Sequence, residues 1–175
     1  MEFRIKLVVI GDPGVGKTSL VRRFISDHFS SDYRASIGTT IYTKKLTLSI
    51  ESSTVDVVLQ IWDIAGQERW AQMRDAYYMG SHGALIVGDL TRKHTFEQIE
   101  NFWVPDLLKN CDKVYMLLLA NKKDLETRIE LDLLKDLKKR ISASSFFLTS
   151  AKENQKVEEA FEFISKEIIT GFTNK

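Results

Sequence analysis

The residues Gly11 to Thr18 constrain the fold of this chain more than any other stretch. They read Gly-Asp-Pro-Gly-Val-Gly-Lys-Thr and match G-x-x-x-x-G-K-[ST], the phosphate-binding P-loop. The apolar run Phe3–Ile10 before them has the length and composition of a buried strand, and Lys17 to about Ser26 favours a helix. Strand, glycine-rich loop and helix in this order are the context that the motif needs, so a glycine-rich turn that matches by chance is a poor explanation.

The same stretch predicts how a nucleoside triphosphate would be held. Glycines let the backbone curl so that successive N–H groups point at an anion, and the helix N-terminus adds its dipole. Lys17 would bring a positive charge to the β- and γ-phosphates, and the Thr18 hydroxyl is placed to ligate Mg²⁺. The motif alone distinguishes neither adenine from guanine nor a hydrolase from a kinase or a switch.

Composition limits the classes of protein that are possible. A chain of 175 residues, 43% of them hydrophobic, can bury one full core, so we expect one domain over residues 1–175. The net charge is +1, with 25 basic and 24 acidic residues, which gives no support for bulk nucleic-acid binding. The single cysteine, Cys111, cannot form an intramolecular disulfide and indicates a reducing compartment. No apolar run approaches the roughly 18 residues of a membrane span, so we expect a soluble, cytoplasmic monomer.

Strand-like and helix-like segments alternate along the chain. The strand candidates are Phe3–Ile10, Tyr42–Ile50, Val55–Trp62, Ala84–Asp89, Val114–Ala120 and Phe146–Leu148. The helix candidates are Lys17–Ser26, Glu68–Tyr78, Thr95–Lys109, Leu131–Ile141 and Val157–Ile169. Alternation of this kind predicts an α/β fold, a doubly wound sheet with helices on both faces. Glu51–Thr54 is too short for a crossover helix, so the strands beside it must form an antiparallel hairpin, and the six-stranded sheet is mixed with one antiparallel edge strand.

Local patterns refine two of these helices. In the last helix, apolar residues recur at helical spacing and predict a buried stripe of Val157, Ala160, Phe161, Ile164 and Ile168. The run Thr95–Gln98 has the pattern of a capping box and predicts a helix start. Pro105 lies well inside that helix and predicts a kink or an interruption near Val104.

The second stretch with chemical content is Asp63–Glu68, Asp-Ile-Ala-Gly-Gln-Glu, after a strand that ends in Trp62. A carboxylate at a strand tip can hold Mg²⁺ through a water molecule. Gly66 offers a backbone N–H that can approach a terminal phosphate closely. The pattern D-x-x-G is weak by itself, but it gains weight at the carboxyl end of a strand, where α/β sheets bind ligands.

The third stretch, Asn121-Lys122-Lys123-Asp124, favours guanine. An ionised Asp accepts two hydrogen bonds only from a base with two adjacent donors, and guanine offers N1–H and its 2-amino group. Adenine has an acceptor at N1 and no 2-amino group, so it would leave a buried charge unpaired. Sites of this kind discriminate by roughly 10⁴ or more.

The fourth stretch, Thr149–Lys152, reads Thr-Ser-Ala-Lys and follows the sixth predicted strand. Its small residues would let backbone amides reach the oxygen of the base. Either this stretch or Asn121–Asp124 alone could be a polar loop. Four such pieces, each after a predicted strand, favour a guanine-nucleotide site.

Taken together, these motifs resemble those of a small GTPase of the Ras superfamily, and the resemblance covers essentially all 175 residues. The runs Leu59–Arg69 and Tyr77–Gly83 are most similar to the Rab branch. The run Phe102–Asp106, Phe-Trp-Val-Pro-Asp, is instead similar to the third helix of Rho proteins. Only 24 residues separate Asp124 from Thr149, which leaves no room for the extra helix that Rho proteins insert there.

By position, the resemblance implies roles for several residues. Phe29 matches the aromatic residue that packs on the edge of guanine, although core or loop packing would explain it equally, and Tyr33 matches the lid over the phosphates. Gln67 matches the residue that orients the attacking water, and Lys122 would lie along the base and ribose. The expected catalytic residues are Gln67 and Lys17, and the expected metal ligands are Thr18, Ser36 and Asp63. The expected nucleotide-binding residues are Asp12, Pro13, Gly14, Val15, Gly16, Lys17, Thr18, Ser19, Phe29, Tyr33, Ser36, Gly66, Asn121, Lys122, Asp124, Ser150, Ala151 and Lys152.

Three positions depart from the family pattern. Ser36 stands where a threonine is usual, which keeps the hydroxyl but loses the methyl that restricts χ1. Pro13 stands where the P-loop approaches Gln67, a place where side chains often hinder hydrolysis in the family. Gly38–Ile41 replaces the Asp and Phe of Rab-type effector recognition, so effectors cannot be transferred from relatives.

The resemblance implies a Mg²⁺-dependent switch that binds GTP and GDP and slowly hydrolyses GTP to GDP and phosphate. The alternative is a binding scaffold locked with GTP or GDP. Effectors, exchange factors and GTPase-activating proteins would bind the loops around Ser36 and Gly66. Six residues follow Ile169 and none is cysteine, so we expect peripheral membrane binding only if a lipidated tail is missing from this chain.

Overall fold

The computed structural model describes residues 2–29 and 37–174 of the chain. These residues form one six-stranded sheet with the strand order β2-β3-β1-β4-β5-β6. The strands are β1 (Glu2–Ile10), β2 (Thr39–Ile50), β3 (Ser53–Ile64), β4 (Gly83–Asp89), β5 (Tyr115–Asn121) and β6 (Ser145–Leu148). Only β2 and β3 pair antiparallel, while the other neighbouring strands of the described sheet run parallel. The predicted mixed sheet with one antiparallel edge strand is therefore confirmed.

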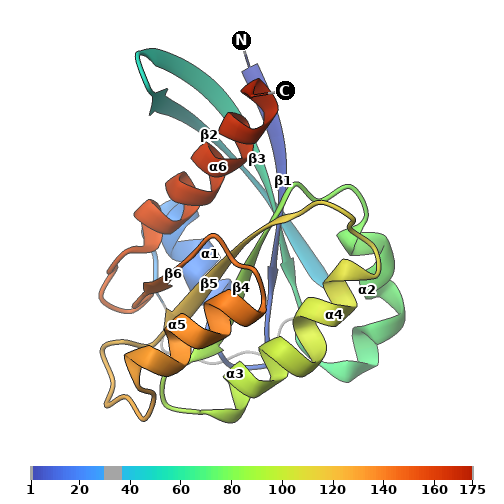
Figure 1. Ribbon diagram of the computed structural model, residues 1–175, viewed down its shortest axis with the longest axis vertical. Helices are drawn as coiled ribbons and strands as arrows, with labels where there is room; N and C mark the ends of the chain where they lie inside the picture. The colour runs from blue at the N-terminus through green and yellow to red at the C-terminus, as the bar shows by residue number, and fades with distance from the viewer. Residues whose placement is uncertain (1, 30–36, 175) are drawn as a thin grey trace.

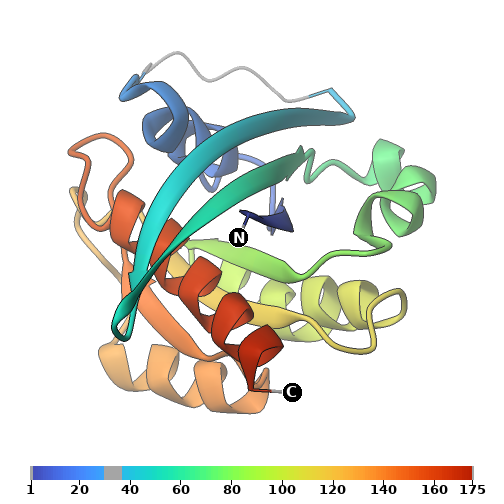
Figure 2. The ribbon, with the colours of Figure 1, turned by 90° about the horizontal axis from the view of Figure 1, so that it is seen from above.

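Helices cover both faces of this sheet (Figures 1 and 2). They are α1 (Lys17–Ser26), η1 (Glu68–Trp70), α2 (Ala71–Tyr78), α3 (His94–Gln98), η2 (Ile99–Trp103), α4 (Val104–Leu108), α5 (Leu131–Arg140) and α6 (Val157–Thr173). Because α3, η2 and α4 follow one another without a gap, and η1 leads into α2, the described part of the chain has the five helices that the sequence predicts.

Alternate residues of β1 point into two separate cores. Ile5, Leu7 and Val9 pack under α1 and α6, where the rings of Phe24 and Phe161 stack with their centroids 4.0 Å apart. Val8 and Ile10 pack on the other face, against the helices from α2 to α5, together with alternate residues of β4 and β5. The five residues of the predicted apolar stripe on α6 are all buried, which confirms that stripe as core packing.

The third helix is interrupted where Pro105 predicts it. Ile99–Trp103 form a π-helical turn, and α4 continues it from Val104 with Pro105 as its second residue. Because proline has no backbone N–H, it cannot bond to the preceding turn, and the π-helical turn stands directly before it. A π turn holds more residues per turn than an α-helix, so it changes the direction of the side chains that follow. Trp103, the last residue of η2, is 2% exposed.

The predicted capping box at Thr95 is wrong. Helix α3 begins at His94, and no side chain caps it. The Thr95 hydroxyl instead donates to the Arg92 carbonyl oxygen at 2.7 Å and accepts the Asp89 N–H at 2.9 Å. These two bonds connect the helix to the end of β4. They form in place of a capping bond because the Asp89 N–H is buried and needs an acceptor.

The final helix extends past its predicted end at Ile169 to Thr173. Phe172 packs this extra turn against Phe3 and His82. Its ring centroid lies 6.5 Å from that of Phe3 and 5.5 Å from that of His82. No helix in residues 2–29 or 37–174 is long and apolar enough to cross a membrane.

Candidate functional site

The carboxyl ends of the parallel strands meet at one edge of the sheet, at the end of the molecule opposite the two termini in Figure 1. The P-loop follows β1 at this edge and leads into α1. Gly14 and Gly16 in it have φ angles of 75° and 103°, which side-chain-bearing residues rarely adopt. A Cβ atom at Gly16 would lie 2.2 Å from the Asn121 amide nitrogen, so the loop passes too close to Asn121 for a larger residue.

The Lys17 side chain bonds to the backbone of its own P-loop. Its side chain is buried, and Nζ donates to the carbonyl oxygens of Gly11 at 2.7 Å and Asp12 at 2.8 Å. Burial lowers the pKa of Lys17 to about 8, although the Asp63 and Asp12 carboxylates act against this shift. A phosphate anion in the loop would stabilise the charged ammonium, as the motif predicts.

Thr18 and Asp63 come together as the two motifs predict. The Thr18 hydroxyl donates to Asp63 Oδ2 at 2.5 Å, and Asp63 is 1% exposed at the end of β3. Burial raises the pKa of Asp63, while the Thr18 hydrogen bond and the Lys17 charge lower it. Its other oxygen, Oδ1, is buried and has no hydrogen-bond partner among the residues that the structure describes. A buried carboxylate oxygen in need of a partner, beside a hydroxyl, fits a hydrated Mg²⁺.

Gly66 lies against the P-loop backbone. A Cβ atom at Gly66 would come within 2.4 Å of the Gly11 carbonyl oxygen and 2.8 Å of the Pro13 nitrogen. The preceding residue, Ala65, donates its N–H to the Gly38 carbonyl oxygen at 2.8 Å. Gln67 follows in extended conformation and is half-buried, so it leaves the strand end directly beside the loop.

Asn121 joins the two predicted base-binding loops to the P-loop. Its amide nitrogen donates to the Val15 carbonyl oxygen at 3.0 Å. Its Oδ1 accepts hydrogen bonds from the Thr149 hydroxyl at 3.1 Å and from the Ala151 N–H at 3.3 Å. One buried side chain therefore connects the phosphate-binding and base-binding parts of the site.

Two charged residues of the Asn121–Asp124 loop, Lys122 and Asp124, are held by neighbouring side chains. The Ser150 hydroxyl donates to Asp124 Oδ1 at 2.7 Å, which orients the carboxylate. Lys122 has a φ of 70°, and its Nζ lies 2.8 Å from Asp89 Oδ2. Ser150 and Ala151 are buried, while Lys152 is exposed.

The remaining predicted residues lie around this centre or outside the described part. Ser19 is in the first turn of α1, next to Thr18. Phe29 is half-buried, with the Arg23 guanidinium 5.9 Å from its ring centroid. Tyr33 and Ser36 lie outside the described residues.

Asp89 is a residue of this edge that the motifs do not predict. It is fully buried at the end of β4 and accepts hydrogen bonds from Thr91 N–H at 2.9 Å, the Thr91 hydroxyl at 2.7 Å and Arg92 Nε at 2.9 Å. Burial acts to raise the pKa of Asp89, but the hydrogen bonds from Lys122, Thr91 and Arg92 outweigh it and lower the pKa. Its place at a strand tip, like that of Asp63, is the signal that could have found it.

The third helix also touches the P-loop. Trp103 Nε1 donates to Asp12 Oδ1 at 2.7 Å, and Arg92 Nη2 donates to the Pro13 carbonyl oxygen at 3.1 Å. These contacts hold the loop in addition to the bonds from Lys17. No spacing rule in the sequence connects Trp103 with Asp12, because they are 91 positions apart.

Known proteins share this sequence pattern along nearly the whole chain. Residues 6–170 match the model of the Ras family. The chain is 40% identical over 172 residues to the Ras-related protein Rab-13 of Rattus norvegicus, which covers 96% of this chain and 81% of that protein. It is 38% identical over 176 residues to the Ras-related protein RABA5b of Arabidopsis thaliana, covering 99% of this chain and 79% of that protein. With the Ras-related protein YPTC6 of Chlamydomonas reinhardtii it shares 37% identity over 175 residues, covering 95% and 76%.

Proposed function

This chain belongs to the Ras family of small GTPases, and on that premise we propose that it is a guanine-nucleotide-dependent molecular switch. It binds GTP and GDP with Mg²⁺ and slowly hydrolyses GTP to GDP and phosphate. The relatives at about 40% identity are Rab proteins, and the process that we propose for this chain is Rab-like trafficking or cytoskeletal signalling.

The observation that carries the proposal is the position of Asn121 between the two base-binding loops and the P-loop. A nucleotide whose phosphates lie in the P-loop would have its base beside Asp124. The Ser150 hydroxyl occupies one side of that carboxylate, and its remaining acceptor sites suit the N1–H and 2-amino donors of guanine. The same pairing would reject adenine.

Mg²⁺ would be held by the Thr18 and Ser36 hydroxyls and, through water, by Asp63. The buried Asp63 Oδ1, unpartnered within the described residues, supports this assignment. When bound, the ion neutralises charge on the β- and γ-phosphates. The Thr18–Asp63 hydrogen bond keeps two of the proposed metal-binding side chains next to each other, which also supports the assignment.

Hydrolysis in this proposal depends on three groups of the chain. Lys17 offsets the charge of the phosphates from inside the P-loop. Gln67 orients the attacking water. Gly66, the residue before it, has no side chain and lets the backbone lie close to the P-loop. Intrinsic turnover should be slow, on the order of 10⁻⁴ to 10⁻³ s⁻¹, as for Ras without its activator.

The switch itself would lie in the loops around Ser36 and Gly66. The Ala65 N–H to Gly38 carbonyl bond joins the described flanks of these two loops. A change at the γ-phosphate that moves one loop would therefore be transmitted to the other. Effectors, exchange factors and GTPase-activating proteins would bind this surface.

One observation favours a second candidate, a scaffold locked with its nucleotide. Pro13 lies against Gly66, directly before Gln67, where a rigid ring can displace the glutamine. Such a protein would bind guanine nucleotides but turn them over no faster than its own Gln67→Leu variant.

The test is the identity of the nucleotide that co-purifies with the protein, followed by single-turnover hydrolysis of GTP and ATP with Mg²⁺. We expect bound GDP or GTP, GTP turnover above that of Gln67→Leu, and no ATP turnover. Equal affinity for ATP and GTP would contradict the proposal. GTP binding with turnover equal to that of Gln67→Leu would establish the scaffold instead.

A further inference from the structure

Arg23, on the last turn of α1, bonds to the loop that carries Ala151 and Lys152. Its Nε donates to the Ala151 carbonyl oxygen and its Nη2 donates to the Lys152 carbonyl oxygen, both at 2.8 Å. These residues are 128 and 129 positions away in the sequence, and the Arg23 side chain is only 14% exposed. A planar guanidinium suits two adjacent carbonyls, because its donors point in fixed and nearly parallel directions.

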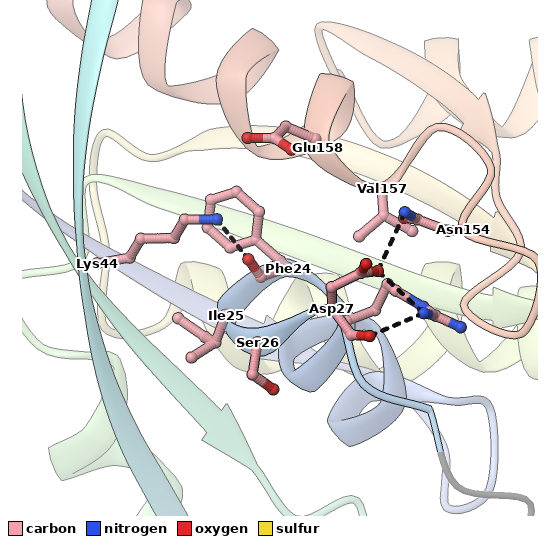
Figure 3. A pocket seen from close by; sticks show the side chains of 9 residues that line it. Phe24, Ile25, Ser26, Asp27, Lys44, Asn154, Val157 and Glu158 are labelled. Atoms are coloured by element: carbon pink, nitrogen blue, oxygen red, sulfur yellow. Dashed lines mark hydrogen bonds and ion pairs between the residues drawn. The ribbon is translucent and has the colours of Figure 1, made fainter.

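The third nitrogen of Arg23 is held by the end of its own helix. Nη1 donates to the Asp27 carbonyl oxygen at 3.1 Å and to Asp27 Oδ1 at 3.0 Å. Asn154, in the loop before α6, donates from Nδ2 to the same Asp27 oxygen at 3.3 Å, and Figure 3 shows the two side chains facing each other. The guanidinium therefore has fixed partners on both α1 and the base-binding loop.

These side chains border a cavity of about 310 Å³ between α1, β2 and the start of α6 (Figure 3). Apart from Glu158, the polar side chains that line it pair with one another or with the backbone. Lys44, across the cavity, donates to the Phe24 carbonyl oxygen, and its Nζ lies 3.8 Å from the Phe24 ring centroid. The pairing favours a support for the neighbouring loop over a ligand site.

The two carbonyl bonds fix the direction of a backbone amide. In a trans peptide the C=O and the following N–H point in opposite directions, and the described chain has no cis peptide. When Arg23 binds the Ala151 carbonyl, the Lys152 N–H must point away from Arg23. Arg23 also lies beside the Phe29 ring, and the resemblance to small GTPases implies that this ring packs on the edge of guanine.

We propose that Arg23 is a positioning residue for guanine recognition: from the end of α1 it sets the loop of Ala151 and Lys152, and with it the Lys152 amide that would meet the base oxygen. This inference rests on the proposed function, because it takes the ligand of the site to be a guanine nucleotide. Arg23 itself touches no part of that nucleotide.

The experiment compares GDP with 6-thio-GDP, which keeps the N1–H and 2-amino groups for Asp124 but replaces the base oxygen with a larger, weaker acceptor. Dissociation constants are measured for the wild type, Arg23→Met, Arg23→Lys and the control Arg140→Met. Arg140 is a solvent-exposed arginine at the end of α5, and its side chain pairs with Glu100 of the third helix at 2.7 Å.

We expect Arg23→Met to weaken GDP about tenfold, the scale of one lost hydrogen bond. The affinity for 6-thio-GDP should change far less. The dissociation constant of 6-thio-GDP divided by that of GDP should therefore move toward one. Arg23→Lys should lie between, since an ammonium cannot bind two carbonyls in one plane. Arg140→Met should equal the wild type for both ligands.

Asp27→Ala is the second variant, because Asp27 is 77% exposed and its loss leaves the core intact while removing one partner of Arg23. We expect it to shift the ratio in the same direction, by about two- to threefold. An unchanged ratio in Arg23→Met, Arg23→Lys and Asp27→Ala would overturn the inference, as would an equal loss of affinity for both ligands. A wild type that binds no GDP would overturn the proposed function and the inference with it.

Discussion

Gly66→Ala tests whether the close approach of Gly66 to the P-loop matters for chemistry. The new Cβ atom would lie 2.4 Å from the Gly11 carbonyl oxygen and 2.9 Å from the Asp12 carbonyl carbon. An ordinary contact needs about 3.5 Å, so the two backbones must separate by about 1 Å. Both neighbours are backbone atoms of a loop that Lys17, Trp103 and Arg92 hold in place, so the strand end bearing Gly66 is the part that moves.

A displacement of about 1 Å next to the reacting groups can lower a rate by on the order of 10²-fold. Gln67 is the adjacent residue, so we expect Gly66→Ala to reduce single-turnover GTP hydrolysis by about that factor. From an intrinsic rate on the order of 10⁻⁴ s⁻¹, the variant would have a time constant of about 10⁶ s, roughly twelve days, so its rate is taken from the first fraction of a turnover. The affinity for GDP should change less, because our proposal places Gly66 beside the terminal phosphate, which GDP lacks.

Gly80→Asn is the matched control. It also adds a side chain to a glycine, no atom lies within 4 Å of its Cβ position, and Asn tolerates the φ of 73° at Gly80. Its hydrolysis rate should equal that of the wild type. If Gly66→Ala hydrolyses GTP within threefold of Gly80→Asn, the reasoning from the 2.4 Å approach is refuted.

Three further perturbations follow from the structure. Asp124→Asn should weaken GTP and favour xanthosine triphosphate, whose 2-oxo group suits an amide donor, in competition binding. Asp106→Ala should lower the free energy of unfolding in urea by about 3–5 kcal/mol, because the buried Arg74, 2.9 Å from Asp106, loses its partner. The control Glu100→Ala, at an exposed ion pair, should leave the free energy of unfolding unchanged. Burial and the Lys6 charge lower the pKa of His82 below the ordinary 6.5, so the unfolded state takes up its proton first and stability is lost as the pH falls through 6.5. Thermal unfolding from pH 7.5 to 5.5 should show that loss in the wild type and not in His82→Asn; equal pH profiles would contradict it.

Spacing along the chain was enough to predict most of the candidate site. The P-loop, Asp63 with Gly66, and Asn121 with Asp124 are short motifs in which a strand end places each side chain relative to the next. The apolar run of β1 and the stripe on α6 likewise predicted segments that are buried in the structure. These features are local, and local geometry is determined by a few backbone torsions per residue.

Tertiary structure decided which distant side chains hold those motifs in place. Trp103 reaches Asp12, and Arg23 reaches Ala151, only because strand order and helix packing bring together residues 91 and 128 positions apart. Thr95 shows the same effect within six residues, since its hydroxyl bonds to the buried Asp89 N–H and not to its own helix. Hydrogen-bonding partners depend on distance in space and on the free-energy cost of leaving a buried group unpaired. Neither quantity can be read from the spacing of residues along the chain.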